Sequence, residues 1–125
     1  MSQLCRDEST ELFGLQPVGC YKDIKEDRAL PHLYLNLRES GIQWNKTRHY
    51  GLDLVVKECS EKAYEKGYEY FGVQHYGECY GNGTDYNKHG ELKKEECDVF
   101  DNRTGHGVGK GLTNFVYRIH KRIKT

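Results

Sequence analysis

A chain of 125 residues has room for one domain with a modest hydrophobic core. Charged residues make up 30% of it, but ten Tyr, four Phe and one Trp supply enough apolar surface to exclude an intrinsically disordered chain. The 19 basic residues balance 19 acidic ones, so the zero net charge argues against binding of nucleic acid or an anionic membrane by charge alone. No apolar run approaches the roughly 20 residues that cross a bilayer, so we expect no membrane insertion.

The N-terminal segment predicts little regular structure. Residues 1–16 are polar and aperiodic, and we expect an arm with at most one helical turn around residues 8–13. Residues 18–22 predict the first strand, which begins after Pro17 and ends at a charged turn. The folded domain is therefore expected to start at about residue 17.

The next segment leaves its structure open. Residues 30–37 alternate Leu with other residues as a strand does, but Pro31 suits an extended loop equally well. Residues 41–51 are predicted to form a loop that contains Trp44. The indole ring would serve either as a surface on which a ligand stacks or as a plug at the edge of the sheet.

One amphipathic helix is predicted in the middle of the chain. Asp53 is its predicted N-cap, because Asp accepts hydrogen bonds from free backbone N–H groups. Gly67 is predicted to end it, because Gly adopts a left-handed conformation without strain. Lys and Glu residues occupy mainly the outer faces. The apolar stripe consists of Val56, Cys59 and Ala63, with Leu52 just before the helix.

An aromatic β-hairpin follows the helix. Residues 68–74 are rich in aromatic residues and predict a strand. Gly77 marks a turn, and residues 78–81 begin the return strand. Residues 82–90 hold Gly, Asn and Asp and predict a polar loop.

The C-terminal part predicts one closing strand. Residues 91–101 are charged, and residues 105–111 form a flexible glycine-rich stretch. Residues 114–119 predict the strand, and residues 121–125 form a basic tail that we expect to be solvated. The side chains that alternation places on one face of this strand are Phe115, Tyr117 and Ile119.

Five cysteines in a short chain predict a disulfide framework. None forms a Cys-x-x-Cys pair, so a zinc site is not expected. Four cysteines allow three pairings, but geometry favours Cys59 with Cys79, because the helix packs on the hairpin that follows it. That bridge closes a loop of about 20 residues and is worth about 3 kcal/mol in the loop-entropy model. Cys20 and Cys97 would form the second bridge, and Cys5 then makes a third contact, stays free or links two chains.

Three Asn-x-Thr sequons agree with a secreted, extracellular glycoprotein. They begin at Asn45, Asn82 and Asn102. Residues 1–19 contain no apolar segment typical of a signal peptide, so either a signal has been removed or the chain is cytosolic with free thiols. The cysteines and the sequons favour the first alternative.

Short motifs occur along the chain in a recognisable order. They are Val18–Asp23, Arg28–Leu30, the helix with Cys59, Tyr70–Gln74, Glu78–Tyr80 and Asn114–Tyr117. As an ordered set they resemble a WSC-type module, a cysteine-rich extracellular domain related in architecture to PAN/apple domains, over about residues 17–120. WSC modules usually carry more cysteines, one of them at the position of Gly81, so this chain resembles a reduced relative. The resemblance implies an α+β fold in which a twisted antiparallel sheet, stapled by about two disulfides, cradles one α-helix and binds carbohydrate or protein.

The hairpin turn and the loop after it hold the candidate ligand-binding residues. Sugars present apolar C–H faces and many hydroxyls, which match aromatic rings beside carboxylate and amide groups. The candidates are His75, Tyr76, Glu78, Tyr80, Asn82, Asp85, Tyr86 and Asn87. The alternative is that the tyrosines pack the sheet and the polar residues form turns. A glycan on Asn82 would crowd this site.

No cofactor is expected. Calcium could take oxygen ligands from two sets of residues, but the spaced acidic pattern of a calcium loop is absent and turn chemistry explains both sets. The six histidines show no metal-binding spacing, and a bridged Cys79 cannot act as a nucleophile beside His75, so we predict neither a metal site nor an enzyme. The two calcium sets are Asn82, Asp85 and Asn87, or Asp98 and Asp101.

These features predict a secreted carbohydrate-binding, lectin-like module whose partner is a glycan or glycoprotein. The alternative is a structural, adhesion or protein–protein interaction domain of an extracellular matrix, assembled as a homo-oligomer that Cys5 links by disulfides. A small enzyme or toxin that acts on nucleic acid or lipid is disfavoured by the zero net charge and by the lack of a catalytic constellation.

Overall fold

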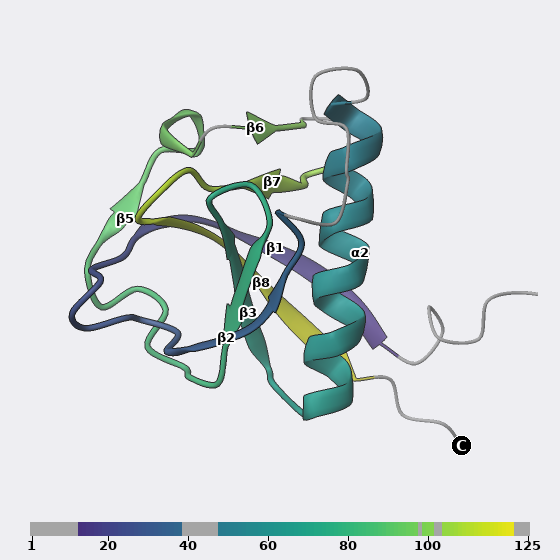
Figure 1. Cartoon of the computed structure of the whole chain (residues 1–125), viewed down its shortest axis with the longest axis horizontal. Helices are drawn as coiled ribbons and strands as arrows, with labels where there is room; N and C mark the ends of the chain where they lie inside the picture. The colour runs from purple at the N-terminus through teal and green to yellow at the C-terminus, as the bar shows by residue number, and fades with distance from the viewer. Residues whose placement is uncertain (1–12, 39–47, 98, 102–103, 122–125) are drawn as a thin grey trace, which may run out of the picture.

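Six antiparallel strands form one sheet, and a long helix, α2 (Arg48–Lys66), covers one face of it (Figure 1). This computed structural model describes residues 13–38, 48–97, 99–101 and 104–121. The α+β fold predicted from the sequence is confirmed. In the order in which they lie side by side, the strands are β2 (His32–Asn36), β4 (Glu78–Gly81), β3 (Tyr70–Gln74), β8 (Thr113–Lys121), β1 (Phe13–Lys22) and β5 (Glu91–Leu92).

A second, two-stranded sheet lies near the first turns of α2 (Figure 1). It pairs β6 (Val99–Phe100) with β7 (Gly107–Val108), and a short 3-10 helix, η2 (Lys94–Glu96), precedes it. The prediction placed no strand in this charged and glycine-rich part of the chain. Within the described ranges, no helix has both the length and the apolar character needed to cross a membrane.

Strand β1 begins at Phe13, five residues before the predicted first strand at Val18. It pairs with β8 along its whole length, from Phe13 opposite Lys121 to Lys22 opposite Thr113. The Phe13 ring also stacks on Tyr64 of α2, with ring centroids 4.7 Å apart. The prediction that residues 13–16 belong to an arm was therefore wrong. Their contacts are with distant elements, and local patterning does not reveal such contacts.

Helix α2 begins at Arg48, so the prediction of a loop up to residue 51 and of an N-cap at Asp53 was wrong. Asp53 lies inside the helix, and its Oδ1 atom is 3.0 Å from Nδ1 of His106. A side chain that suits a cap is a weak signal, because packing on the sheet decides where the helix starts. Gly67 ends the helix in the left-handed conformation with φ of 80°, as predicted.

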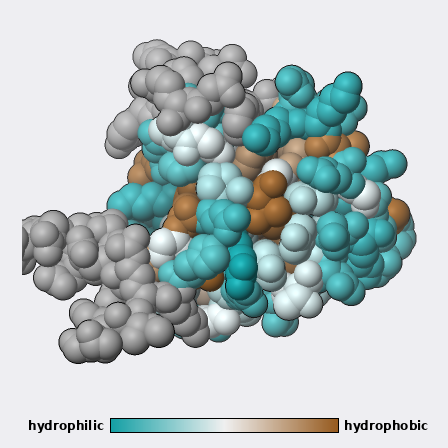
Figure 2. Space-filling view, turned by 180° about the vertical axis from the view of Figure 1, so that it is seen from behind, coloured by the Kyte–Doolittle hydropathy of each residue, from teal (hydrophilic) through white to brown (hydrophobic). Residues whose placement is uncertain are grey.

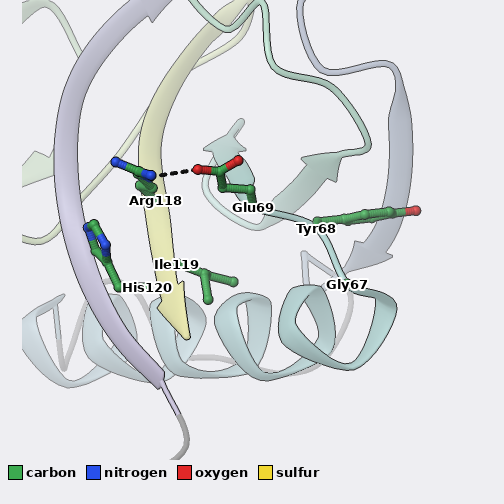
Figure 3. A pocket seen from close by; sticks show the side chains of 6 residues that line it. All are labelled: Gly67, Tyr68, Glu69, Arg118, Ile119 and His120. Carbon is green, nitrogen blue, oxygen red and sulfur yellow. Dashed lines mark hydrogen bonds and ion pairs between the residues drawn. The ribbon is translucent and has the colours of Figure 1, made fainter. Parts of the chain in front are cut away.

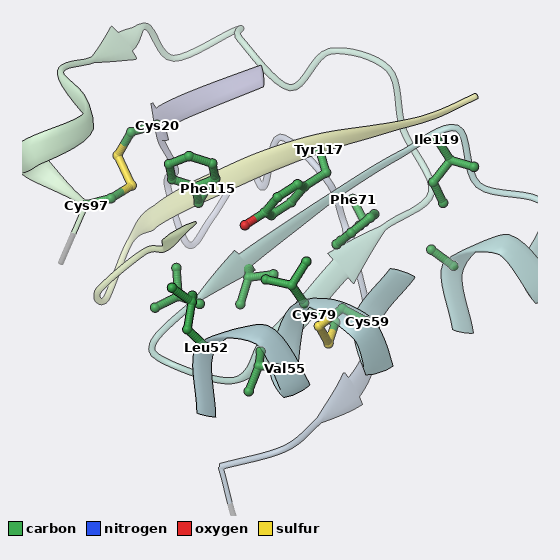
Figure 4. Close-up of a cluster of buried hydrophobic side chains, with 14 of the residues drawn as sticks. Cys20, Leu52, Val55, Cys59, Phe71, Cys79, Cys97, Phe115, Tyr117 and Ile119 are labelled. Atoms are coloured by element: carbon green, nitrogen blue, oxygen red, sulfur yellow. A yellow bond between two sulfur atoms is a disulfide. The ribbon is translucent and has the colours of Figure 1, made fainter. Parts of the chain in front are cut away.

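The hydrophobic core lies between α2 and the sheet (Figure 4). The predicted helix stripe is buried there together with Val55. The predicted inward face of the closing strand is buried as well, and Phe71 of β3 stacks on Tyr117 with centroids 5.0 Å apart. Fully burying one large apolar side chain stabilises the fold by about 1.5–3 kcal/mol. The core residues of β3 and β8 are Phe71, Val73, Phe115, Tyr117 and Ile119.

Two disulfides join the elements as predicted (Figure 4). Cys59–Cys79 fastens α2 to β4, and Cys20–Cys97 fastens β1 to the segment after η2. The bridges therefore cross-link both the helix layer and the late charged segment to the sheet. Several residues of the sequence predictions lie outside the described residues, namely Cys5, Trp44, Asn45, Asp98 and Asn102.

Candidate functional site

Strand β4 separates the predicted ligand-binding residues into two groups. One group lies at the β3–β4 turn, where the strand begins, and the other lies in the loop that follows its last residue, Gly81. Tyr80 lies on the strand itself. The turn group is His75, Tyr76 and Glu78, and the loop group is Asn82, Asp85, Tyr86 and Asn87. The sequence-predicted residues therefore do not form one continuous cluster.

The turn group is tied to the fold. His75 and Tyr76 have φ values of 51° and 68°, a left-handed conformation that is uncommon outside glycine. The Tyr76 N–H donates to the Gly109 carbonyl at 3.2 Å, and its side chain packs against the core. His75 Nδ1 lies 3.6 Å from Glu78 Oε2. Much of the aromatic surface at this turn therefore serves packing.

Tyr80 presents little surface to a ligand. It is only 5% exposed, and the Arg28 guanidinium lies over its ring, 4.6 Å from the centroid. Burial raises the pKa of the Tyr80 phenol, and the neighbouring Glu78 carboxylate raises it further. Tyr80 therefore supports Arg28 and the loop that carries it.

A buried hydrogen-bond network holds that loop on the face of the sheet that points away from α2. Asp23 Oδ2 accepts from Arg28 Nη1 and Gln74 Nε2, both at 2.8 Å. Asp23 Oδ1 accepts from the Ala29 N–H at 2.9 Å. Gln74 Nε2 also donates to Asn114 Oδ1 at 3.0 Å. Because buried polar groups are costly unless paired, this network fixes the path of the chain after β1.

The loop group contributes one aromatic side chain to the same face. The Tyr86 ring lies 4.8 Å from the Tyr70 ring of β3 and meets the Tyr21 ring of β1 edge-on at 5.1 Å. Tyr21 is buried, which raises its pKa, whereas Tyr70 and Tyr86 are half-buried. The loop thus brings together rings from two strands that are not neighbours in the sheet.

Charged groups continue this row of rings. Arg118 of β8 is the register partner of Tyr70, and its guanidinium lies 5.9 Å from the centre of that ring. Arg118 Nε donates to Glu69 Oε2 at 2.8 Å, and both side chains are nearly half exposed, at 43% and 45%. We name Tyr21, Tyr86, Tyr70, Arg118 and Glu69 the tyrosine–arginine row.

A surface pocket of about 410 Å³ adjoins the charged end of the row (Figure 3). Figure 3 shows Arg118 and Glu69 pointing toward each other, His120 beside Arg118, and Tyr68 on the side away from His120. His120 Nε2 lies 2.6 Å from Gln16 Oε1 of β1. The volume falls at the lower end of the 300–1,000 Å³ that is typical of small-ligand pockets. The lining residues are Gly67, Tyr68, Glu69, Arg118, Ile119 and His120.

Sequence reasoning found Tyr86 but missed Tyr70, Glu69 and Arg118 as site residues. Alternation in the closing strand was a usable signal, because it places Arg118 on the face opposite Tyr117. The pairing of β3 with β8 was not visible in the sequence. Asn82 lies in the loop with an exposed side chain and φ of 70°. Among the residues that the structure describes, no group of three or more His, Cys, Asp or Glu side chains could hold a metal.

The surface around the site is mainly polar. Figure 2 shows the molecule from behind, with separate apolar patches among hydrophilic residues. Within the described ranges, the large apolar side chains that are exposed are Ile24, Leu33 and Leu112. Contacts of this surface with a partner would therefore rely mainly on polar groups. No protein-family model matches this sequence, and no curated protein matches it either.

Proposed function

We propose that this chain is an extracellular, non-enzymatic module of the WSC and PAN/apple type that binds carbohydrate through the tyrosine–arginine row. The observation that carries the proposal is the row in which the half-buried Tyr86 ring packs on Tyr70 and the Tyr70 ring lies beside Arg118 of the Arg118–Glu69 ion pair. Aromatic rings offer surface to the C–H faces of a sugar, while guanidinium and carboxylate groups donate to and accept from its hydroxyls.

The two disulfides support an extracellular location, because such bonds persist in oxidising compartments and are rare in the cytosol. The exposed Asn82 begins a sequon and is a suitable acceptor for an N-linked glycan on a secreted chain. No cofactor has a role in this proposal, since hydrogen bonding and ring contacts alone account for recognition of a sugar.

A glycan array probed with secreted protein tests the proposal. We expect Tyr86→Ala and Arg118→Gln to weaken binding by about tenfold or more, since each removes a central contact. His75→Asn at the β3–β4 turn is the control, because Asn tolerates the left-handed conformation and the turn lies at the other end of β4. Binding of no glycan, or equal binding by wild type and Tyr86→Ala, would remove the proposal.

The row also favours a second candidate function, because Tyr and Arg are enriched at the energetic centres of protein–protein interfaces. In this alternative the chain is an adhesion or matrix domain that assembles with copies of itself. Light scattering and non-reducing gels of wild type and Cys5→Ser discriminate the two functions. A monomer in both samples, together with glycan binding, decides for the carbohydrate module.

A further inference from the structure

The ion pair at the edge of the pocket has unused hydrogen-bonding capacity. Arg118 donates to Glu69 through Nε alone, and within the described part of the chain neither of its Nη groups has an acceptor. Within the same ranges, Oε1 of Glu69 has no donor. One side of the pair therefore offers donors and the other offers an acceptor to a molecule in the pocket.

The backbone fixes where these two groups stand. The Ile119 N–H donates to the Glu69 carbonyl at 2.7 Å, and β3 and β8 pair from the next residue onward, Tyr70 opposite Arg118. Two residues that are far apart in sequence are thus held side by side by the sheet. Such positioning lowers the conformational cost of binding.

Tyr68, another residue that lines the pocket, is held in place as well. The Tyr68 hydroxyl is hydrogen-bonded to Nδ1 of His32, and its ring meets the Tyr34 ring edge-on with centroids 5.5 Å apart. Tyr34 is itself fixed, because its hydroxyl donates to the Cys59 carbonyl of α2 at 2.8 Å. The Tyr68 ring is therefore fixed toward β2, and Figure 3 shows it pointing away from Arg118 and Glu69, so the charged pair is the part of the lining that faces a ligand.

The charge of the pair selects among sugars. Arg118 and Glu69 neutralise each other, so a neutral sugar meets no net charge in binding to them. Two adjacent hydroxyls of one sugar ring can accept from the guanidinium and donate to the carboxylate at the same time. An acidic sugar gains a contact with Arg118 but places its own negative charge beside Glu69, which opposes binding.

We infer that the pocket binds a neutral sugar unit through adjacent hydroxyl groups, and that the Arg118–Glu69 pair discriminates against uronic, sialic and sulfated sugars. This inference rests on the proposed carbohydrate-binding function and names the class of sugar. Glu69 is thereby a specificity-determining residue, since its carboxylate both accepts from the preferred sugar and repels the acidic one.

The experiment compares neutral glycans with their uronic, sialylated and sulfated counterparts on one array. The samples are wild type, Glu69→Gln and Arg118→Gln, with Glu65→Gln as the matched control. Glu65 makes an exposed ion pair with Lys62 on α2 and does not line the pocket, so the same chemical change is made outside the lining. Thermal unfolding and intact disulfide mass establish that every variant is folded.

We expect wild type and Glu65→Gln to prefer neutral glycans by about tenfold or more. Glu69→Gln should weaken neutral binding and raise acidic binding by about tenfold, because the guanidinium loses its competing carboxylate. Arg118→Gln should weaken both. A gain of binding to acidic glycans cannot arise from misfolding.

Two outcomes overturn the inference and are distinguishable. If wild type binds glycans but prefers acidic ones, or if Glu69→Gln leaves the neutral-to-acidic ratio unchanged, the inference fails while the carbohydrate function stands. If wild type binds no glycan of either class, the carbohydrate function fails and the inference fails with it.

Discussion

Gly72 of β3 and Asn114 of β8 approach so closely that a Cβ atom on residue 72 would lie 2.8 Å from Asn114 Cγ. Asn114 is fully buried and belongs to the network with Gln74 and Asp23. Its Nδ2 atom is the one buried side-chain polar atom without a hydrogen-bond partner among the described residues. The Asn114 amide therefore occupies the space that a side chain at position 72 would need.

Gly72→Ala should destabilise the fold by about 1–3 kcal/mol, because the added methyl group overpacks a rigid and fully buried site. Denaturant unfolding measures the change. Gly111→Ala is the control, since a Cβ atom there meets no atom within 4 Å. Equal midpoints for both variants would contradict the close packing of Gly72 and Asn114.

Asp23→Ala should lower the free energy of unfolding by about 3 kcal/mol, because three donors lose the acceptor that they share. These donors are the Gln74 amide, the Ala29 N–H and the Arg28 guanidinium. Asp27→Ala provides the comparison, since Asp27 forms an exposed ion pair with Lys88 and exposed pairs contribute little. Urea unfolding of both variants is the measurement. If Asp27→Ala proves as harmful as Asp23→Ala, the network does not have the structural role assigned to it.

The fold should lose stability at alkaline pH because of its packed tyrosines. Burial raises the pKa of Tyr21, Tyr34, Tyr80 and Tyr117 above the ordinary tyrosine value of about 10. A phenol whose pKa is raised by folding binds its proton more tightly in the folded state. Its stabilising contribution is therefore fully present below about pH 10 and is lost as the pH rises through the folded-state value.

Absorbance of tyrosinate, followed from neutral to strongly alkaline pH, checks this expectation. A fraction of the ten tyrosines should ionise only together with unfolding, whereas in denaturant all should ionise in one step near pH 10. Identical titration curves in the two conditions would show that these rings are not buried.

Removing either disulfide should destabilise the fold, and the two losses should differ in size. Replacing Cys59 and Cys79 by Ser opens a loop with a separation of 20 residues, and the loop-entropy model assigns that bridge about 3 kcal/mol. The Cys20–Cys97 bridge spans 77 residues and is assigned about 4.5 kcal/mol.

Denaturant unfolding of the two double variants measures these losses, and intact mass with and without reductant counts the bridges. The larger loss should follow removal of Cys20–Cys97. Natively produced protein in which every thiol reacts with an alkylating agent before reduction would contradict both bridges and the proposed extracellular location.

The parts of the fold that were predicted correctly depend on neighbours along the chain. Phe115, Tyr117 and Ile119 alternate, and Val56, Cys59 and Ala63 recur at helical spacing, so each set defines one buried face. The start of α2 at Arg48 and of β1 at Phe13 was missed. The contacts seen for Phe13, for example, are with β8 and with Tyr64 of α2.

The candidate site, like the fold, was predicted only in part from the sequence. Tyr86 was predicted from its polar and aromatic surroundings, but its packing on Tyr70 and Tyr21 was not. Arg118 was placed in the predicted closing strand without a functional role, and its pairing with Glu69 depends on the register between β3 and β8. Register between strands from distant parts of the chain is set by tertiary packing, so local sequence does not encode it in readable form.

By itself, then, the sequence determined the aromatic hairpin and the buried faces, and it favoured Cys59–Cys79 among the three pairings that four cysteines allow. The buried faces follow from periodicity and the favoured pairing from the short path between the helix and its hairpin, whereas the α+β class was what the resemblance to a WSC-type module implied. Only the tertiary structure decided which strands are neighbours and thereby placed Arg118 beside Tyr70 and Glu69. The physical reason is that burial of a shared core selects strand order and register collectively, over contacts that span the whole chain.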